Sequence, residues 1–499
     1  MKTFRTMRHK RTAALCAGVV AAHLAWGMAT TALAQSATPA DSDRSTTSQT
    51  RLDPDSERVS ATDPTAPDAL DDDTQDASDI TTGSIDSPIE NPSDIFDQEA
   101  LQELRRQNQR EATVDGLRLR NAENRNDAQG VRLGTFILRP SITETIGGER
   151  TTTGKDVDDR TFLRSGLKAT LDSDWSLHRF RIDADGAWDK TLSGDEENDP
   201  EASIRAELRL DLSDETTANL RAGYSLRRED IGDPNAIADA TTQSDVNEYT
   251  AGADITRDLG VLRATAGVDF RRETYGDAVL ANGDSLSQSD RDRNAVQLRG
   301  RLGYELSAVL IPFVEVVYGR TIYDQHQDSL GYVRDADAYG AKVGTEVDFG
   351  EKLKGELAGG YLTADFDDAA LKSISAFTLD GNALWSPYRG TNLAFNLRTE
   401  IEPSTTAGAS GSTAYIGTAV LSQVILQNLT GQISSGLTLR DYSQDSSAQE
   451  TVLALGTGVT WNISRSLDMN ADIAWEKTDQ DGAPNQETLR AGIGLTLKR

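Results

Sequence analysis

Residues 262–271 read LRATAGVDFR, an unbroken alternation of apolar and polar residues. A period of two places the apolar residues on one face of a β-strand and the polar residues on the other. The same alternation recurs in residues 202–212 and 467–477. Such runs exceed the ~5–6 residues of a usual strand and match the ~9–11 residues that a tilted strand needs to cross a bilayer. The pattern therefore predicts membrane-spanning strands.

A soluble β-sheet protein shows the same period of two, with its apolar face toward a core. Two features favour the membrane. The polar faces carry many Arg, Asp and Glu residues, as in residues 202–212. Hydrophobic residues are only 37% of the chain, which is low for a soluble protein of this length. We predict an all-β fold: a transmembrane antiparallel up-and-down β-barrel of about 18 strands, with 16 strands as the alternative because each strand signal is weak.

The connections between the predicted strands alternate in length. Residues 213–215 and 464–466 are tight turns, whereas residues 147–160, 229–247 and 276–293 form long acidic connections. Outer-membrane barrels have short periplasmic turns and long extracellular loops. This alternation places both ends of the barrel at the periplasmic rim.

Aromatic residues fall on the predicted outward faces, many near a strand end. Interfacial girdles need amphipathic rings there, although aromatic residues favour strands in any case. The outward set is Trp188, Tyr224, Tyr304, Tyr339, Tyr361, Phe377, Trp385, Tyr415, Trp461 and Trp475.

Residues 1–34 are typical of a signal peptide: a basic start, a short apolar stretch and Ala32-Leu33-Ala34 before Gln35. The apolar stretch is interrupted by His23 and is too short for a membrane anchor. Cys16 is the only cysteine of the chain, so the mature protein has no disulfide and no cysteine-based metal site. Leu15 precedes it where a lipoprotein signal needs a small residue.

Residues 35–130 have a different composition, rich in Asp, Ser, Thr and Pro. Such a segment cannot bury enough apolar surface to offset its ordering entropy, so we predict a disordered acidic periplasmic segment. The composition around residues 97–112 predicts a short helix within it. A solvated spacer is one interpretation; a plug in the barrel, or a contact with a periplasmic partner, is the other. The barrel is predicted to occupy residues 131–499.

Several functional classes are disfavoured. The formal net charge of −29 makes nucleic acid a poor partner. The chain has no phosphate-binding or dinucleotide-binding motif and no paired carboxylate site, so we expect no cofactor, no bound metal and no catalytic residues. His178 and His326 lack a nucleophile and acid at a recognisable spacing. Asp365, Asp367 and Asp368 could bind divalent cations at lipopolysaccharide phosphates, but a solvated acidic loop explains them more simply.

The barrel region resembles the uncharacterised large outer-membrane barrels of the putative β-barrel porin 2 family. The resemblance rests on residues 133–140 (LGTFILRP), the hairpin pattern and the final strand at residues 489–498, and it covers about the last three quarters of the chain. It implies the outer membrane of a Gram-negative bacterium, with lipid, lipopolysaccharide and the barrel-assembly machinery as partners. Some members resemble exopolysaccharide export components, which implies periplasmic export partners. The chain ends Leu497-Lys498-Arg499 rather than on the aromatic residue that the assembly machinery reads in many barrels.

An interior as wide as that of an 18-stranded barrel is not filled by side chains and forms an aqueous channel. Its wall is then the candidate functional site. Small uncharged residues such as Asn396, Gln432 and Ser434 predominate on the inward faces of the later strands, and cations on those of the earlier strands. The predicted pore-lining cations are Arg164, Lys168, Arg179, Arg181, Arg205, Arg209, Arg221, Arg227, Arg263, Arg271, Arg299 and Arg301.

An arginine-rich wall favours anions in a pore. The other interpretation is that Arg–carboxylate pairs hold the wall rigid without selectivity. Three functions remain open: a porin-like channel for small hydrophilic and anionic solutes, an outer-membrane component of polysaccharide export, and a plugged surface barrel whose loops bind a ligand.

Overall fold

The computed structural model describes residues 128–194, 199–229, 235–237, 240–405, 408–442, 449–481 and 484–499. The predicted signal peptide lies outside the described residues, as does the predicted acidic segment apart from residues 128–130. Within the described ranges, no helix is long and apolar enough to span a membrane.

Eighteen long strands follow one another along the chain, as the alternation predicts. Their bounds are β2 (Phe136–Thr153), β3 (Asp156–Ser173), β4 (Arg179–Ser193), β5 (Asp199–Ser213), β6 (Thr216–Arg228), β8 (Asp245–Asp258), β9 (Leu262–Tyr275), β12 (Arg293–Tyr304), β13 (Leu310–Tyr323), β14 (Ala336–Asp348), β15 (Leu353–Phe366), β16 (Ile374–Trp385), β17 (Thr391–Pro403), β18 (Gly411–Leu426), β19 (Leu429–Tyr442), β20 (Gln449–Asn462), β21 (Leu467–Gln480) and β22 (Gln486–Lys498).

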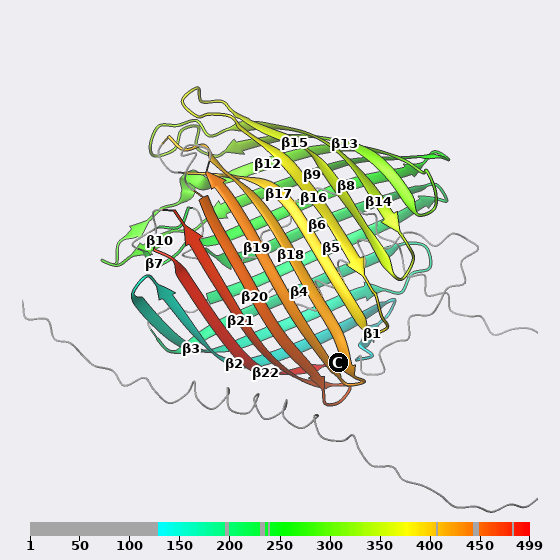
Figure 1. The fold of residues 1–499 in the computed structure, drawn as a ribbon, viewed down its shortest axis with the longest axis horizontal. Helices are drawn as coiled ribbons and strands as arrows, with labels where there is room; N and C mark the ends of the chain where they lie inside the picture. The colour runs from blue at the N-terminus through cyan, green and yellow to red at the C-terminus, as the bar shows by residue number, and fades with distance from the viewer. Residues whose placement is uncertain are drawn as a thin grey trace, which may run out of the picture. The chain divides into compact units, whose positions relative to one another are not determined.

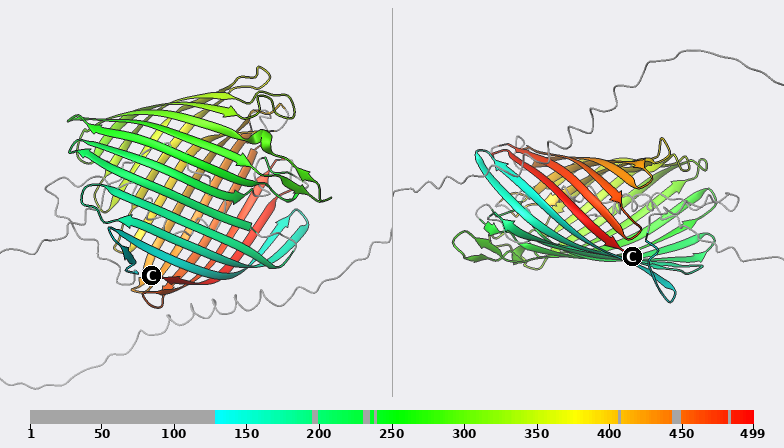
Figure 2. Two further views of the ribbon diagram at one scale, coloured as in Figure 1. Left: turned by 180° about the vertical axis from the view of Figure 1, so that it is seen from behind. Right: turned by 90° about the horizontal axis from the view of Figure 1, so that it is seen from below.

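Each long strand pairs antiparallel with the next one, and β2 pairs with β22 from Ser141↔Lys498 to Thr153↔Gln486. The sheet is therefore a closed barrel, and the predicted count of 18 strands is confirmed. The strands run obliquely around the wall (Figures 1 and 2). The short strand β1 (Val131–Leu133) extends β2 as a hairpin, and β7 (Ala240–Thr242), β10 (Ala278–Leu280) and β11 (Ser285–Leu286) form a small sheet in two loops. A short 3₁₀ turn, η2 (Ser289–Arg291), follows β11.

The two faces of the wall differ in the way that a membrane barrel requires. Apolar side chains on the outer face are exposed, among them Val343 at 64% and Leu357 at 55%. Many charged side chains on the inner face are buried instead, as Arg301 and Glu315 illustrate. The period of two in each strand produces this inversion, because consecutive residues alternate between lipid and lumen.

The two rims of the barrel differ in their connections. One rim, here called the turn rim, holds the tight connections such as residues 214–215 and 427–428. The first residue of β2 and the last residue of β22 also lie at this rim. The opposite rim, the loop rim, holds the longest connections, residues 229–244, 276–292 and 324–335. Both ends of the described barrel thus lie at the rim of short turns, as expected.

An aromatic band follows the outer face near the loop rim. Tyr224 packs against Tyr249 with ring centroids 5.0 Å apart, and Tyr318 packs against Tyr339 at 5.4 Å. Tyr361, Phe377 and Tyr415 continue the band on later strands. Tyr249 and Tyr318 were not among the aromatic residues predicted for it.

One predicted connection is wrong. Residues 147–160 were expected to form a loop, but β2 and β3 continue as paired strands to Thr153↔Asp156. Arg150 and Asp159 form a bidentate ion pair across this extension, with bonds of 2.6 and 3.1 Å. The polar Thr-rich and Asp-rich sequence indicated a loop because it lacks apolar alternation, which strands beyond the lipid do not need.

The same new charge should cost far more stability on the outer face than on the inner face. Val343→Arg places a guanidinium on the lipid-facing side in the middle of β14 and should cost about 2–4 kcal/mol of unfolding free energy. Gln297→Arg places one on the lumen-facing side of β12 opposite Asp269 and should cost less than about 1 kcal/mol. Reversible urea unfolding in lipid vesicles measures both; equal costs would contradict the assignment of faces.

Candidate functional site: the charged inner wall and the loops at its mouth

The predicted pore-lining cations lie on the inner face of β3, β4, β5, β6, β9 and β12. At least eight of the twelve form ion pairs with carboxylates of the same or nearby strands and turns. These pairs join Arg164 to Asp189 and Glu201, Arg179 and Arg181 to Asp172, Arg209 to Asp211, Arg221 to Asp254 and Asp269, Arg263 to Asp258 and Glu305, Arg271 to Glu248 and Glu273, and Arg301 to Glu315, Glu346 and Glu356.

The remaining four are Lys168, Arg227 and Arg299, which also have a hydrogen-bonding or electrostatic partner, and Arg205. They differ in exposure: Arg299 is buried, whereas Arg205 is exposed to the lumen. Arg205 forms no ion pair with any residue that the structure describes, so it stands out on the early wall as a cation open to a solute.

Arg301 is the centre of the largest of these clusters. Its Nε donates to Glu315 at 2.9 Å, and its Nη1 donates to Glu356 at 3.0 Å and to Glu346 at 3.2 Å. The guanidinium also lies over the Phe313 ring, 4.0 Å from the centroid. Residues from four consecutive strands, β12 to β15, meet at this one cation.

A second cluster crosses the closing strand pair and was not predicted. Asp189, almost completely buried, accepts hydrogen bonds from Arg164 at 3.1 Å and from Arg490 at 2.8 Å. The Arg490 and Arg160 guanidinium groups both lie over the Phe162 ring, at 4.3 and 5.2 Å. Alternation alone places Arg490 inside the barrel, but its contact with Asp189 depends on which strand closes the ring.

The later strands carry more inward charge than the sequence indicated. Arg440 donates to Glu402 at 2.6 Å and also pairs with Glu450, while Lys342 lies 2.7 Å from Asp380. The expected small uncharged residues lie between these groups. The contrast between a charged and an uncharged wall is therefore weaker than predicted.

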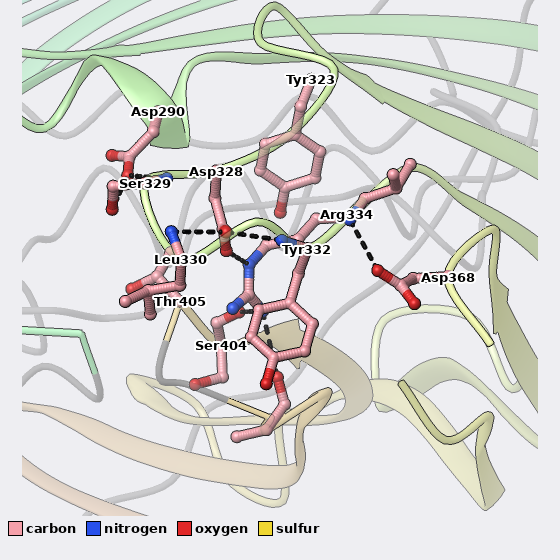
Figure 3. Close-up of polar contacts among 12 residues, drawn as sticks. Asp290, Tyr323, Asp328, Ser329, Leu330, Tyr332, Arg334, Asp368, Ser404 and Thr405 are labelled. Atoms are coloured by element: carbon pink, nitrogen blue, oxygen red, sulfur yellow. Dashed lines mark hydrogen bonds and ion pairs between the residues drawn. The ribbon is translucent and has the colours of Figure 1, made fainter. Parts of the chain in front are cut away.

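The loops at the loop rim are joined across the mouth, as Figure 3 shows for one part of them. Arg334, in the loop after β13, donates to the backbone carbonyls of Ser404 and Ala409 in the loop after β17. Asn235, in the loop after β6, donates to the Pro403 carbonyl and accepts from the Thr405 N–H at 3.0 Å. We call this set of contacts the loop junction.

The loop junction spans the barrel. Seven strands stand between β6 and β17 on one side of the ring and nine on the other, so these two strands lie on nearly opposite walls. Further contacts attach the loop after β9: Arg291 donates to Glu229 at 2.9 Å, and the Ser329 hydroxyl donates to Asp290 at 2.9 Å. Backbone from several loops thus crosses the entrance to the lumen.

Asp328 fixes the conformation of the loop after β13 and pairs with Arg334 of the loop junction. It accepts the Tyr332 and Leu330 N–H groups at 2.8 and 2.9 Å and the Arg334 Nε at 2.6 Å. Burial alone would raise the pKa of Asp328, but these hydrogen bonds outweigh it and hold the pKa of this carboxyl below its ordinary value. Arg334 is itself buried, so the pair is an internal part of the loop structure.

The remaining candidates from the sequence have local roles. Arg320 forms ion pairs with Asp335, Asp337 and Asp367, and Asp368 accepts the Val333 and Ala370 N–H groups. His178 accepts the Asp211 N–H at 3.2 Å in the turn before β4. These contacts order the rims of the barrel.

Substitution of Arg301 by a neutral residue leaves the buried carboxylates of this cluster without a cation to pair with. Arg301→Met should cost about 3–5 kcal/mol of unfolding free energy, because unpaired buried charge is expensive. Arg205→Met, on the same wall but without an ion pair, should cost less than about 0.5 kcal/mol. Both are measured by urea unfolding in vesicles, and comparable losses in the two variants would contradict the cluster's structural role.

The loop junction should depend on pH through Asp328. A lowered folded-state pKa contributes stability that is present above the ordinary aspartate value of about 3.9 and is lost as pH falls through the folded-state value. Hydrogen exchange of residues 324–335, corrected for the intrinsic rate, should show constant protection from neutral pH down to about pH 4 and a loss below it. Asp328→Asn should lack that protection even at neutral pH; wild-type protection in this variant would refute the role of the carboxylate.

The family model described as "Putative beta-barrel porin 2" matches residues 125–499. No curated protein sequence matches the chain. Similar solved structures include two Pseudomonas aeruginosa proteins: the outer-membrane protein OpdK (13% identity, 72% of this chain and 99% of that one, TM-score 0.39) and OprD (12% identity, 75% and 97%, TM-score 0.38). A third, OccK2 (OpdF) of the same organism, is 11% identical over 72% of this chain and 98% of its own length, with a TM-score of 0.39. The family match spans the whole described barrel, and the chain belongs to the putative beta-barrel porin 2 family.

Proposed function

We propose that the protein is a channel in the outer membrane of a Gram-negative bacterium that passes small hydrophilic solutes, anions among them. The observation that carries the proposal is the inversion of the wall: apolar side chains face outward and charged side chains face a lumen enclosed by 18 strands. A ring of that size leaves room for water and solute. The charged inner face would keep the lumen filled with water and would offer polar contacts to the solute along its path.

The ion pairs bear on selectivity. Most predicted pore-lining cations face a carboxylate within 4 Å, so their fields largely cancel at a distance. A net preference for anions would then rest on cations without such a partner, and Arg205 is the described example. The preference is expected to be modest rather than absolute.

A plugged or gated barrel is a second candidate, because the loop junction lies across the entrance. In that case the loops, or residues 35–130, would control access to the lumen. Such control would favour a role in polysaccharide export over passive diffusion. Single-channel conductance in a planar bilayer separates these candidates. Steady conductance of the mature protein supports the open channel; near silence that is relieved by deleting residues 35–100 supports the gated one. Silence in both forms would refute transport.

Selectivity is tested by the reversal potential under a salt gradient. Arg205→Ser should shift it toward cation preference, because the variant removes an exposed positive charge from the lumen. Arg263→Ser and Arg299→Ser should shift it in the same direction. Gln297→Ser, a neutral change on the same wall, is the control. An unchanged potential in all three arginine variants would show that the arginines only hold the wall together.

A further inference from the structure

The ladder between β16 and β17 is incomplete. These strands pair only between Gly381–Trp385 and Leu393–Leu397. The ladders on either side are continuous: β15 pairs with β16 from Leu353↔Trp385 to Ala364↔Ile374, and β17 pairs with β18 from Thr391↔Gln423 to Pro403↔Gly411. Residues 374–380 and 398–403 therefore face each other without backbone pairing. We call these two segments the β16–β17 seam.

Side chains bridge the seam in place of the ladder. The Thr399 hydroxyl accepts the Leu379 N–H at 2.9 Å and donates to the Leu379 carbonyl at 3.2 Å. Asp380 accepts the Thr399 N–H at 3.0 Å, and Tyr415 donates from β18 to the Phe377 carbonyl at 3.0 Å. Each of these bonds can break without unpairing a neighbouring ladder.

Lipid makes such a break unusual. Backbone groups in the hydrocarbon have no water to bond, so open sheet edges are tolerated only against protein or a water-filled cavity. Both flanking ladders are complete. The break is therefore local to the seam.

The loop junction accounts for where the seam lies. β17 runs directly into the loop that Arg334 and Asn235 hold across the mouth. β16 instead stays in register with β15 to its first residue, Ile374. The two strands thus have different attachments toward the loop rim, and they lack backbone pairing over the half of their length that is nearest to it.

The surroundings of the seam are apolar outside and polar inside. Phe377 is 61% exposed on the outer face, in the aromatic band where lipid head groups meet acyl chains. Thr378, the next residue, faces the lumen and is fully buried, and its hydroxyl has no hydrogen-bond partner among the residues that the structure describes. The Lys342–Asp380 ion pair lies beside it. A molecule in this position would meet lipid-like contacts on one side and unsatisfied polar groups on the other.

We propose that the β16–β17 seam is a lateral opening between the lumen and the outer leaflet, which admits amphipathic molecules that carry a polar head and an acyl chain. The head would enter the lumen beside Thr378 while the chain stays outside beside Phe377. The Thr399, Asp380 and Tyr415 hydrogen bonds close the opening when it is empty. The proposal does not depend on conduction along the barrel axis.

Quenching by lipid tests the opening directly. The one cysteine of the chain is Cys16 in the predicted signal peptide, so Thr378→Cys in the full mature protein can be labelled uniquely with a bimane. The protein is reconstituted in vesicles of phosphatidylcholine with brominated acyl chains. Ile416→Cys is the matched control: Ile416 is also buried and lumen-facing, and it also follows an aromatic-band residue, but its strand is paired on both sides. Leu357→Cys, on the outer face, reports full exposure to lipid.

Bimane at residue 378 should be quenched at least about twofold more than bimane at residue 416, because only the seam exposes the lumen face to acyl chains. Thr399→Val, which removes two bridging bonds, should increase quenching at residue 378 and leave residue 416 unchanged. Equal weak quenching at residues 378 and 416 in folded protein would overturn the proposal. If Thr378→Cys does not give the heat-modifiable gel band of a folded barrel, Ala376→Cys, the next lumen-facing seam position, decides by the same comparison.

Discussion

The structure depends on one requirement: in a bilayer, every backbone N–H and C=O group needs a partner within the protein. A closed ring of strands meets most of that requirement, and side chains bond the backbone at the β16–β17 seam. The ring is completed by the pairing of β2 with β22. Closure also creates two environments from one repeating pattern, because each strand presents alternate residues to lipid and lumen. The outer apolar surface, the aromatic band and the charged interior all follow from it.

The charged interior is organised as clusters around single arginines rather than as a uniform ladder. Arg301 collects carboxylates from three neighbouring strands, and Asp189 collects arginines from both sides of the ring closure. Planar guanidinium groups suit this role because they donate several hydrogen bonds in fixed directions. Such clusters keep the wall rigid while leaving the lumen hydrophilic, so the residues that stabilise the wall also form its inner surface.

Much of this could be predicted from the sequence, and the limits have identifiable causes. Alternation is a local signal, so it places Arg263 and Arg299 on the inner face and Val343 on the outer face without knowledge of the ring. It carries no information on which distant strands meet, so the contact of Arg490 with Asp189 was missed. Residues 391–403 are recognisable as a strand, but a local pattern does not reveal that residues 398–403 lack backbone pairing with β16. The long polar ends of β2 and β3 resembled a loop because they lie beyond the apolar pattern.

The pairing of β2 with β22 also constrains how the barrel is made. These are the first and last of its long strands, so the ring closes only after the whole barrel sequence has been delivered. Contacts between such distant segments carry a large entropic cost of loop closure and therefore form slowly. Until then the growing sheet has two open edges, which are templates for pairing with other chains. A chain that lacks its first or last strand could not form the β2–β22 pairing and would keep both edges unpaired. Closure of the ring therefore distinguishes an intact barrel sequence from a truncated one.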